Sequence, residues 1–192
     1  MFLRKLDLGK VADQSIAADV LLRSPGYMLS SYGMLPSVEA CVDLARSFPP
    51  DCAEQDRLCF AAFIKDSPVA LAQVGQHWPS RRQASILLLT VAESEHRGHL
   101  GCEVVERLSK QARRWEGIES WYLSVLDNSP AALNFWRHCG FHTVALDIEA
   151  PGMPGRMINM RRALKTRPVC QHGKIHDNPA QLRNLCIAAR FG

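Results

Sequence analysis

A turn between an apolar run and an amphipathic helix carries residue types suited to binding an anion. The turn, AESEHRGHLG, covers residues 92–101 and contains Arg97, Gly98 and Gly101. A helix that opens from such a turn presents free backbone N–H groups and the positive end of its dipole. Glycine allows close approach of the backbone to a ligand, and arginine adds positive charge. The segment therefore predicts a site for a pyrophosphate, a group that helix N-termini bind.

The elements around this turn are expected to alternate between strands and helices. Ile86–Val91 is an unbroken apolar run, typical of a central strand buried on both faces. The helix from about Cys102 to Trp115 has one apolar stripe and a basic opposite face, and we expect Gly117 to end it. Beyond it the sequence predicts a strand, a short helix and two strands, at 121–126, 131–138, 141–148 and 157–161.

Upstream of the turn, the pattern predicts a strand, two helices and a hairpin. The strand is Phe2–Leu8, the helices cover residues 10–23 and 38–48, and the hairpin strands are 58–64 and about 69–77. Pro25-Gly26 should break the first helix, and a loop should follow it. The result is an α/β fold with one domain over residues 1–164. A tail, 165–192, follows with a short helix candidate at Pro179–Ala189.

Composition limits the class of protein. The 192 residues suit one domain, and 47% hydrophobic with 22% charged residues argues against disorder. The net charge of +4 is too small to favour nucleic acid. Seven cysteines without a CxxC pair are read as reduced thiols. No apolar run is long enough to span a bilayer, so we expect a cytoplasmic protein without membrane contact.

Residues 86–141 resemble the central motif of the GNAT superfamily of acetyltransferases. In that motif a buried strand leads through a Q/R-x-x-G-x-G/A turn to a helix, and the next strand ends in Asn. A further helix closes with an aromatic pair and Gly-Phe. The matching stretches here are ILLLTV, EHRGHLG, VVERLSKQA, WYLSVLDN, PAALNFW and CGF. The resemblance covers roughly residues 1–164. It implies the GNAT fold, a mixed sheet of about six or seven strands with helices on both faces, its fourth and fifth strands splayed for acetyl-CoA.

The turn matches the family's motif in either of two registers. Counting without gaps from Val91 puts His96 at the Q/R position, His99 at the first Gly and Gly101 at the second. A shift of one residue instead aligns Arg97-Gly98 with the family's Arg-Gly pair. In both registers the backbone N–H groups of the turn are expected to bind the coenzyme's phosphates.

The resemblance also implies where acetyl-CoA (coenzyme A) contacts the chain. Its pantetheine arm would pair with backbone groups of the apolar strand, one of which would polarise the thioester carbonyl. Asn128 would hydrogen-bond a pantetheine amide, cap the next helix, or do both. The residues expected to bind the coenzyme are Leu89, Thr90, Val91, His96, Arg97, Gly98, His99, Leu100, Gly101, Cys102, Asn128, Ala132, Phe135 and Trp136.

The reaction implied by the resemblance is direct attack of a primary amine on the acetyl thioester in a ternary complex. The ammonium form must first lose a proton, usually to a carboxylate or an imidazole. Glu93, just beyond the apolar strand, is the first candidate, and His77, at the end of the preceding strand, is the second. Each is also consistent with an ordinary loop residue.

A tryptophan stands where many GNAT enzymes have the tyrosine that reprotonates the coenzyme thiolate. Because the indole of Trp136 cannot transfer a proton in that way, either Tyr27, Tyr32 or water would do so, or the thiolate would leave unassisted. The candidate catalytic residues are therefore Glu93, His77 and Tyr32.

The acceptor is expected to be a small-molecule amine. Tyr27, Met28, Tyr32 and Trp78 would bind it, with Met34 nearby. Two alternatives stay open: acetylation of a macromolecular amine, on a protein or an aminoacyl-tRNA, and a non-catalytic protein that binds acyl-CoA. Homodimers are frequent in the superfamily.

No metal site is expected. His96 and His99 have no paired ligand at helical spacing. In the tail, Cys170, His172 and His176 are zinc-type ligands, but their spacing fits no standard finger.

Overall fold

The computed structural model describes residues 1–33, 35–96, 99–148 and 155–164. Within these ranges the strands are β1 (Phe2–Leu6), β2 (Arg57–Ile64), β3 (Ser67–Gly75), β4 (Gln83–Val91), β5 (Ser120–Leu126), β6 (His142–Ile148) and β7 (Met157–Ala163). The α-helices are α1 (Val11–Leu22), α2 (Pro25–Tyr32), α3 (Val38–Arg46), α4 (Leu100–Ala112) and α5 (Pro130–His138). Two short 3-10 segments are η1 (Glu54–Asp56) and η2 (Glu93–Glu95).

The strands form one mixed sheet in the order β1-β2-β3-β4-β5-β7-β6. Neighbouring strands are antiparallel except β4 and β5, which are parallel. The expected sheet of about six or seven strands, with the apolar run as a central strand, is confirmed.

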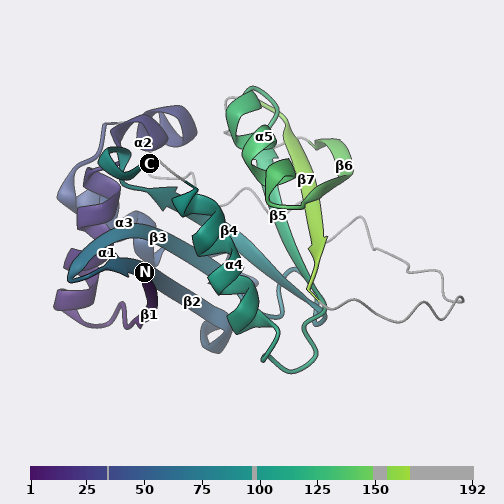
Figure 1. Cartoon of the computed structure of the whole chain (residues 1–192), viewed down its shortest axis with the longest axis horizontal. Coiled ribbons are helices and arrows are strands. Elements are labelled where there is room, and N and C mark those ends of the chain that lie inside the picture. The colour runs from purple at the N-terminus through teal and green to yellow at the C-terminus, as the bar shows by residue number, and fades with distance from the viewer. Residues whose placement is uncertain (34, 97–98, 149–154, 165–192) are drawn as a thin grey trace, which may run out of the picture.

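The parallel pair β4–β5 is joined only at its beginning. The pairing runs from Gln83↔Ser120 to Ser85↔Tyr122. Beyond that point β4 continues beside β3 as far as Val91, whereas β5 continues beside β7 as far as Leu126. Figure 1 shows the two halves of the sheet diverging on either side of this point, with α4 crossing in front. The predicted splay between the fourth and fifth strands is confirmed.

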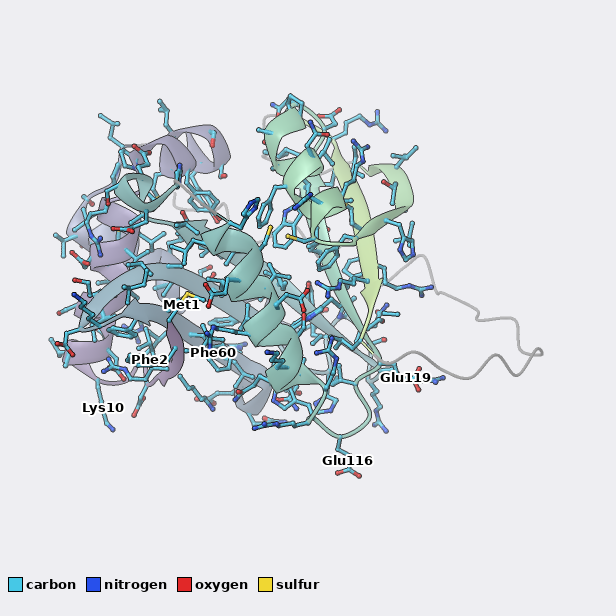
Figure 2. All side chains as sticks on the ribbon, viewed as in Figure 1. Met1, Phe2, Lys10, Phe60, Glu116 and Glu119 are labelled. Atoms are coloured by element: carbon cyan, nitrogen blue, oxygen red, sulfur yellow. The ribbon has the colours of Figure 1, made fainter. Side chains whose placement is uncertain are left out.

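Each face of the sheet has its own hydrophobic core. On one face, Phe60 and Ile86 pack with the apolar stripe of α4, which includes Val105 and Leu108. Figure 2 shows Phe60 to one side of this helix. On the other face, α1, α2 and α3 cover the sheet through residues such as Leu21, Met28 and Leu44. The helices on both faces agree with the expected layering.

The loop expected after Pro25-Gly26 is wrong, because α2 begins there. Pro25 occupies the first turn of α2, where a missing N–H costs nothing, and Gly33 ends the helix in the left-handed conformation with φ of 67°. Proline therefore ends α1 and starts a second helix within three residues. This matters for the site, because α2 carries Tyr27 and Tyr32.

Smaller differences concern the helix after the turn and the tail. Helix α4 ends at Ala112, so Gly117 does not end it. Gly117 instead adopts φ of 72° in the connection to β5. The tail, with its helix candidate and its Cys170, His172 and His176, lies outside the described residues.

Among the helices that the structure describes, none has the length and apolar character needed to cross a membrane.

Candidate active site

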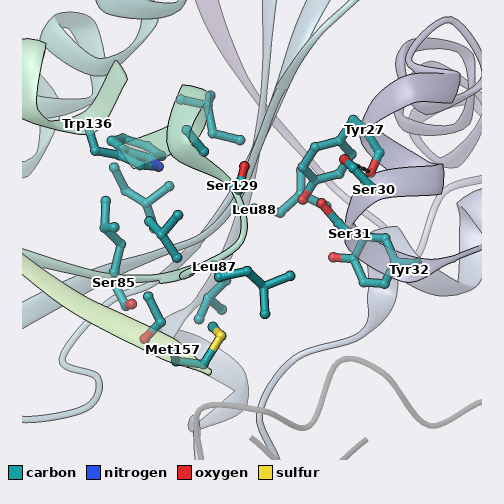
Figure 3. Close-up of a pocket in the computed structure, with 17 residues that line it drawn as sticks. Tyr27, Ser30, Ser31, Tyr32, Ser85, Leu87, Leu88, Ser129, Trp136 and Met157 are labelled. Atoms are coloured by element: carbon teal, nitrogen blue, oxygen red, sulfur yellow. Dashed lines mark hydrogen bonds between the residues drawn. The ribbon is translucent and has the colours of Figure 1, made fainter. Parts of the chain in front are cut away.

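The point where β4 and β5 part opens into a cavity of about 180 Å³. Its walls come from α2, β4, β5, α5 and β7 (Figure 3). The lining residues are Tyr27, Ser30, Ser31, Tyr32, Ser85, Ile86, Leu87, Leu88, Leu89, Leu123, Ser124, Val125, Leu126, Ser129, Ala132, Trp136 and Met157. The cavity therefore lies between two strand edges that no longer bond to each other.

None of the residues that line the cavity is charged, and one side of it is the edge of β4. Parallel pairing stops at Ser85, whose hydroxyl donates to the carbonyl of Tyr122 at 3.1 Å. Beyond it, the edge of β4 around Leu87 and Leu89 faces the cavity instead of β5. Backbone N–H and C=O groups at such an edge need partners. An extended ligand that carries amide groups fits this edge as an added strand would.

Two tyrosines form the wall on the α2 side. The rings of Tyr27 and Tyr32 pack edge to face with centroids 5.9 Å apart, and both line the cavity. Burial raises the pKa of Tyr32, and it raises the pKa of Tyr27 further, where the neighbouring Tyr32 adds to the effect. Both phenols therefore stay protonated at neutral pH and can donate a hydrogen bond or a proton into the cavity.

The opposite wall is aromatic. Figure 3 shows Trp136 across the cavity from Tyr27 and Tyr32. Trp136 is only 8% exposed, and its ring packs between Phe135 and Phe141 at centroid distances of 4.9 and 5.1 Å. Ala132, one turn earlier on α5, also lines the cavity. Helix α5 therefore supplies an apolar wall with no group for proton transfer.

The start of α4 lies beside the end of β4. His99 is the N-cap residue, and Leu100, Gly101 and Cys102 form the first turn, whose N–H groups have no partner within the helix by geometry. A Cβ on Gly101 would lie 2.9 Å from the ring of Phe135. A larger residue at this position would therefore require the ring of Phe135 on α5 to shift, a restriction that the sequence alone does not reveal. Arg97 and Gly98 lie outside the described residues.

Side chains at the end of β4 fold back on the strand. Nε2 of His96 donates to the carbonyl of Val91 at 2.8 Å, and the hydroxyl of Ser24 reaches the same carbonyl at 3.2 Å. Thr90 is buried within the strand. This end of β4 is therefore fixed to the α1–α2 junction and to η2.

Glu93 holds α2 rather than facing the cavity. Its Oε1 accepts a hydrogen bond from the backbone N–H of Gly26 at 2.6 Å, and its own N–H donates to the carbonyl of Arg23 at 2.9 Å. A carboxylate at the first turn of a helix is stabilised by the helix dipole. Glu93 does not appear in the cavity lining.

His77 and Trp78 lie at the other end of β4. Because β3 runs antiparallel to β4, the end of β3 lies beside the start of β4. Nδ1 of His77 contacts Asp56 and its Nε2 contacts the carbonyl of Glu116, both at 3.1 Å. Figure 2 places Glu116 at the far end of the molecule from α5. His77 and Trp78 line a separate pocket there.

The remaining predicted residues fall in two places. Met28 is 1% exposed and packs in the core, so it does not line the cavity. Asn128 is exposed in the loop before α5, where Ser129, not Asn128, is the N-cap residue. The neighbouring Asp127 fastens this loop to β7, since its Oδ1 accepts from the N–H of Arg156 at 3.1 Å.

Several residues that line the cavity were not predicted from the sequence. Ser30, Ser31, Ser85, Ser129 and Met157 line it without belonging to any motif. Ser129 stands next to a predicted site residue, Asn128, which was expected to cap the next helix or to contact the coenzyme. In the described part of the chain, no group of three or more His, Cys, Asp or Glu side chains is arranged to hold a metal.

The comparisons with known proteins agree with this geometry. Residues 30–141, more than half of the chain, match the sequence model of the acetyltransferase (GNAT) family. The chain therefore belongs to the GNAT acetyltransferase family, whose members use acetyl-CoA. A search of curated proteins found no significant match.

Three solved structures of the same fold align with this chain over nearly their whole length. An acetyltransferase from Thermus thermophilus is 24% identical, with a TM-score of 0.66, covering 85% of this chain and 97% of its own. The ribosomal-protein-S18-alanine N-acetyltransferase of Escherichia coli is 16% identical, with a TM-score of 0.60 and coverage of 90% and 99%. Spermidine N-acetyltransferase from Vibrio cholerae, solved with CoA and spermine, is 16% identical, with a TM-score of 0.63 and coverage of 85% and 95%. At these identities the similarity shows the fold alone.

Proposed function

We propose that this protein transfers the acetyl group of acetyl-CoA to the primary amine of a small molecule by direct attack in a ternary complex. The observation that carries the proposal is the cavity between the parted strands β4 and β5, which joins a free backbone edge to a wall of phenols. The solved Vibrio cholerae relative, with CoA and spermine bound, gives a precedent for a small amine acceptor on this fold.

The residues around the cavity suit an extended thioester ligand. The edge of β4 at Leu87 and Leu89 would hydrogen-bond the amides of the pantetheine arm, and a backbone N–H there would polarise the thioester carbonyl. Ala132 and Trp136 would cover the arm from α5. The first turn of α4 would bind the pyrophosphate through its N–H groups.

Coenzyme A supplies the activated acetyl group, and the chain supplies position and protons. A C–N bond forms to the acetyl carbon while its C–S bond breaks. The attacking nitrogen gives one proton to water, and the departing thiolate takes one from a phenol. We assign that phenol to Tyr32, which lines the cavity beside Tyr27 and whose pKa is raised by burial and lowered in part by the hydrogen bond with Tyr27.

Neither predicted general base fits this arrangement as the structure has it. The carboxylate of Glu93 is bound to the N–H of Gly26, and His77 lies at the opposite end of β4. We therefore assign Glu93 a positioning role, and we assign water as the acceptor of the proton that the amine loses.

Turnover with defined amines tests the proposal. Release of coenzyme A thiol would be followed with acetyl-CoA and a panel of monoamines, polyamines, amino acids, aminoglycosides and short peptides. We expect at least one small amine to be acetylated, with the product confirmed by mass. Acetylation of peptide N-termini alone, with no small amine turned over, would contradict the proposed acceptor class and leave the acetyltransferase assignment intact.

A further inference from the structure

Two cysteines meet where the helices on either side of the cofactor site touch. Cys102 lies in the first turn of α4, and Cys139 ends α5. Their sulfur atoms are 3.4 Å apart although the residues are 37 positions apart in the sequence. Both are free thiols. A disulfide needs an S–S distance near 2.05 Å, so about 1.3 Å of movement would join them.

The two thiols are not equivalent. Cys102 is half-buried and so can be reached from solvent, whereas Cys139 is only 8% exposed. Burial raises the pKa of Cys139 to about 12, and the neighbouring Cys102 adds to this rise. Cys139 is therefore expected to stay a thiol until Cys102 has been oxidised and its sulfur becomes a target for attack. This is the usual division between an attacking and a resolving cysteine.

A positive charge lies beside the pair. Arg162, on β7, pairs with Glu106 through one nitrogen, while its buried Nη1 has no hydrogen-bond partner among the described residues. Its side chain runs past Gly140, the residue after Cys139, at 3.6 Å from a Cβ placed there. This charge favours the thiolate of Cys139 and so lowers its pKa, in opposition to the effect of burial. A guanidinium in that place would help Cys139 lose its proton as it attacks.

We propose that Cys102 and Cys139 are a peroxide-reactive pair that closes to a reversible disulfide between α4 and α5. The Cys102 thiolate attacks hydrogen peroxide, so that its sulfur is oxidised to a sulfenic acid and hydroxide leaves. The Cys139 sulfur then attacks the sulfenic sulfur, an S–S bond forms and water leaves. In total, two thiols and one hydrogen peroxide give one disulfide and two waters. A dithiol reductant reverses the change.

Closure would disturb the cofactor site, an extension that rests on the proposed function. The ring of Phe135 lies 2.9 Å from the place where a Cβ on Gly101 would be, so the first turn of α4 has little room to move closer to α5 unless that ring or the backbone shifts. The N–H groups that would bind the pyrophosphate belong to that same turn. Oxidation is therefore expected to weaken acetyl-CoA binding by about tenfold, within the usual range for coupled sites.

The disulfide is tested by peptide mapping. The reduced full chain would be treated with hydrogen peroxide, quenched, alkylated and digested. We expect a loss of two hydrogens from the intact mass and one cross-linked peptide pair that joins residues 102 and 139. Cys139→Ser should abolish that pair and leave a sulfenic acid on Cys102 that dimedone traps. Cys41→Ser, at a buried cysteine of α3, is the matched control and should retain the cross-link.

Two outcomes would overturn the pair. One is that Cys102 and Cys139 both remain alkylatable while peroxide oxidises tail cysteines Cys170 and Cys186. The other is that the Cys139→Ser variant, which circular dichroism shows to be folded, still loses two hydrogens on oxidation and forms a disulfide that involves Cys102. The mass and cross-link measurements need no acetyl-CoA, so they test the cysteine pair independently of the proposed function. Equal acetyl-CoA affinity before and after cross-linking would overturn the coupling, and absence of binding to the reduced chain would overturn the proposed function instead.

Discussion

The carboxylate of Glu93 accepts a hydrogen bond from the backbone N–H of Gly26 at 2.6 Å, and this bond joins the end of β4 to the start of α2. The two residues are 67 positions apart in the sequence. One of them follows the strand that would bind the thioester, and the other begins the helix that carries Tyr27 and Tyr32. The contact therefore fixes the distance between the two walls of the cavity.

Substitutions at Glu93 separate a positioning role from general-base catalysis. Gln keeps an oxygen that accepts from Gly26, so Glu93→Gln should retain kcat/KM within about threefold. Glu93→Ala removes a charge-assisted hydrogen bond, and kcat/KM should fall about tenfold or more. The pH profile of Glu93→Gln should match that of the wild type. If Gln and Ala are equally inactive, Glu93 is the base and the positioning role is wrong.

The two phenols of α2 should differ in their effect on turnover. Tyr32→Phe removes the proposed proton donor, so kcat should fall by about a hundredfold while the KM for acetyl-CoA changes little. Tyr27→Phe keeps the packed ring and is the matched control, with an expected loss of about threefold or less. Steady-state kinetics with one saturating amine measure both. A larger loss for Tyr27→Phe would exchange the two roles.

Gly101 should be required for packing between α4 and α5. A methyl group there would lie 2.9 Å from the ring of Phe135, so Gly101→Ala should lower the free energy of unfolding by about 1–3 kcal/mol. Phe135→Leu removes that ring edge, and the double variant should lose less than the sum of the single losses. Denaturant unfolding of all four proteins measures the coupling. Strict additivity would show that the glycine serves another purpose.

Leu89, Ala132 and Trp136 were predicted for the site, line the cavity and lie on elements whose type the sequence predicts. The apolar run Ile86–Val91 and the helix after it are fixed by hydrophobic pattern, and they place Leu89 and Leu100 near the site. The short helix at 131–138 is also predicted by local signals, whereas the place of Trp136 at the site was expected from the resemblance to the GNAT motif. These elements could be expected from the chain alone.

What the sequence did not reveal depends on pairing and on context. Pro25 breaks one helix and starts another, and nothing local distinguishes the two roles until α2 packs Met28 into the core. His77 follows a strand just as Glu93 does, but antiparallel pairing of β3 with β4 sends it to the opposite end of the sheet. The contact of Cys102 with Cys139 exists only because the fold brings the start of α4 beside the end of α5.

His77 should make the stability of the protein depend on pH. The side chain of Asp56 raises the pKa of His77, with a further contribution from the carbonyl of Glu116. The folded protein therefore binds this proton more tightly than the unfolded chain does. The contribution is complete below the unfolded pKa of His and is lost as pH rises through the higher folded pKa.

Denaturant unfolding from about pH 6 to about pH 9, a range that extends above the usual His value, measures this contribution. The free energy of unfolding should fall with rising pH in the wild type, and part of that fall should be missing in His77→Gln. Asp56→Asn should remove most of the same part, because it takes away the principal cause of the shift. Identical pH dependence in all three proteins would contradict the assignment.

Binding of acetyl-CoA in the gap between β4 and β5 can be measured by calorimetric titration of the wild type and a matched pair of variants. Ala132 lines the cavity, whereas the adjacent Ala131 is exposed and does not line it. We expect micromolar binding by the wild type and by Ala131→Trp, and no binding by Ala132→Trp when circular dichroism shows that it is folded. Equal binding by both variants, or none by the wild type, would contradict the account.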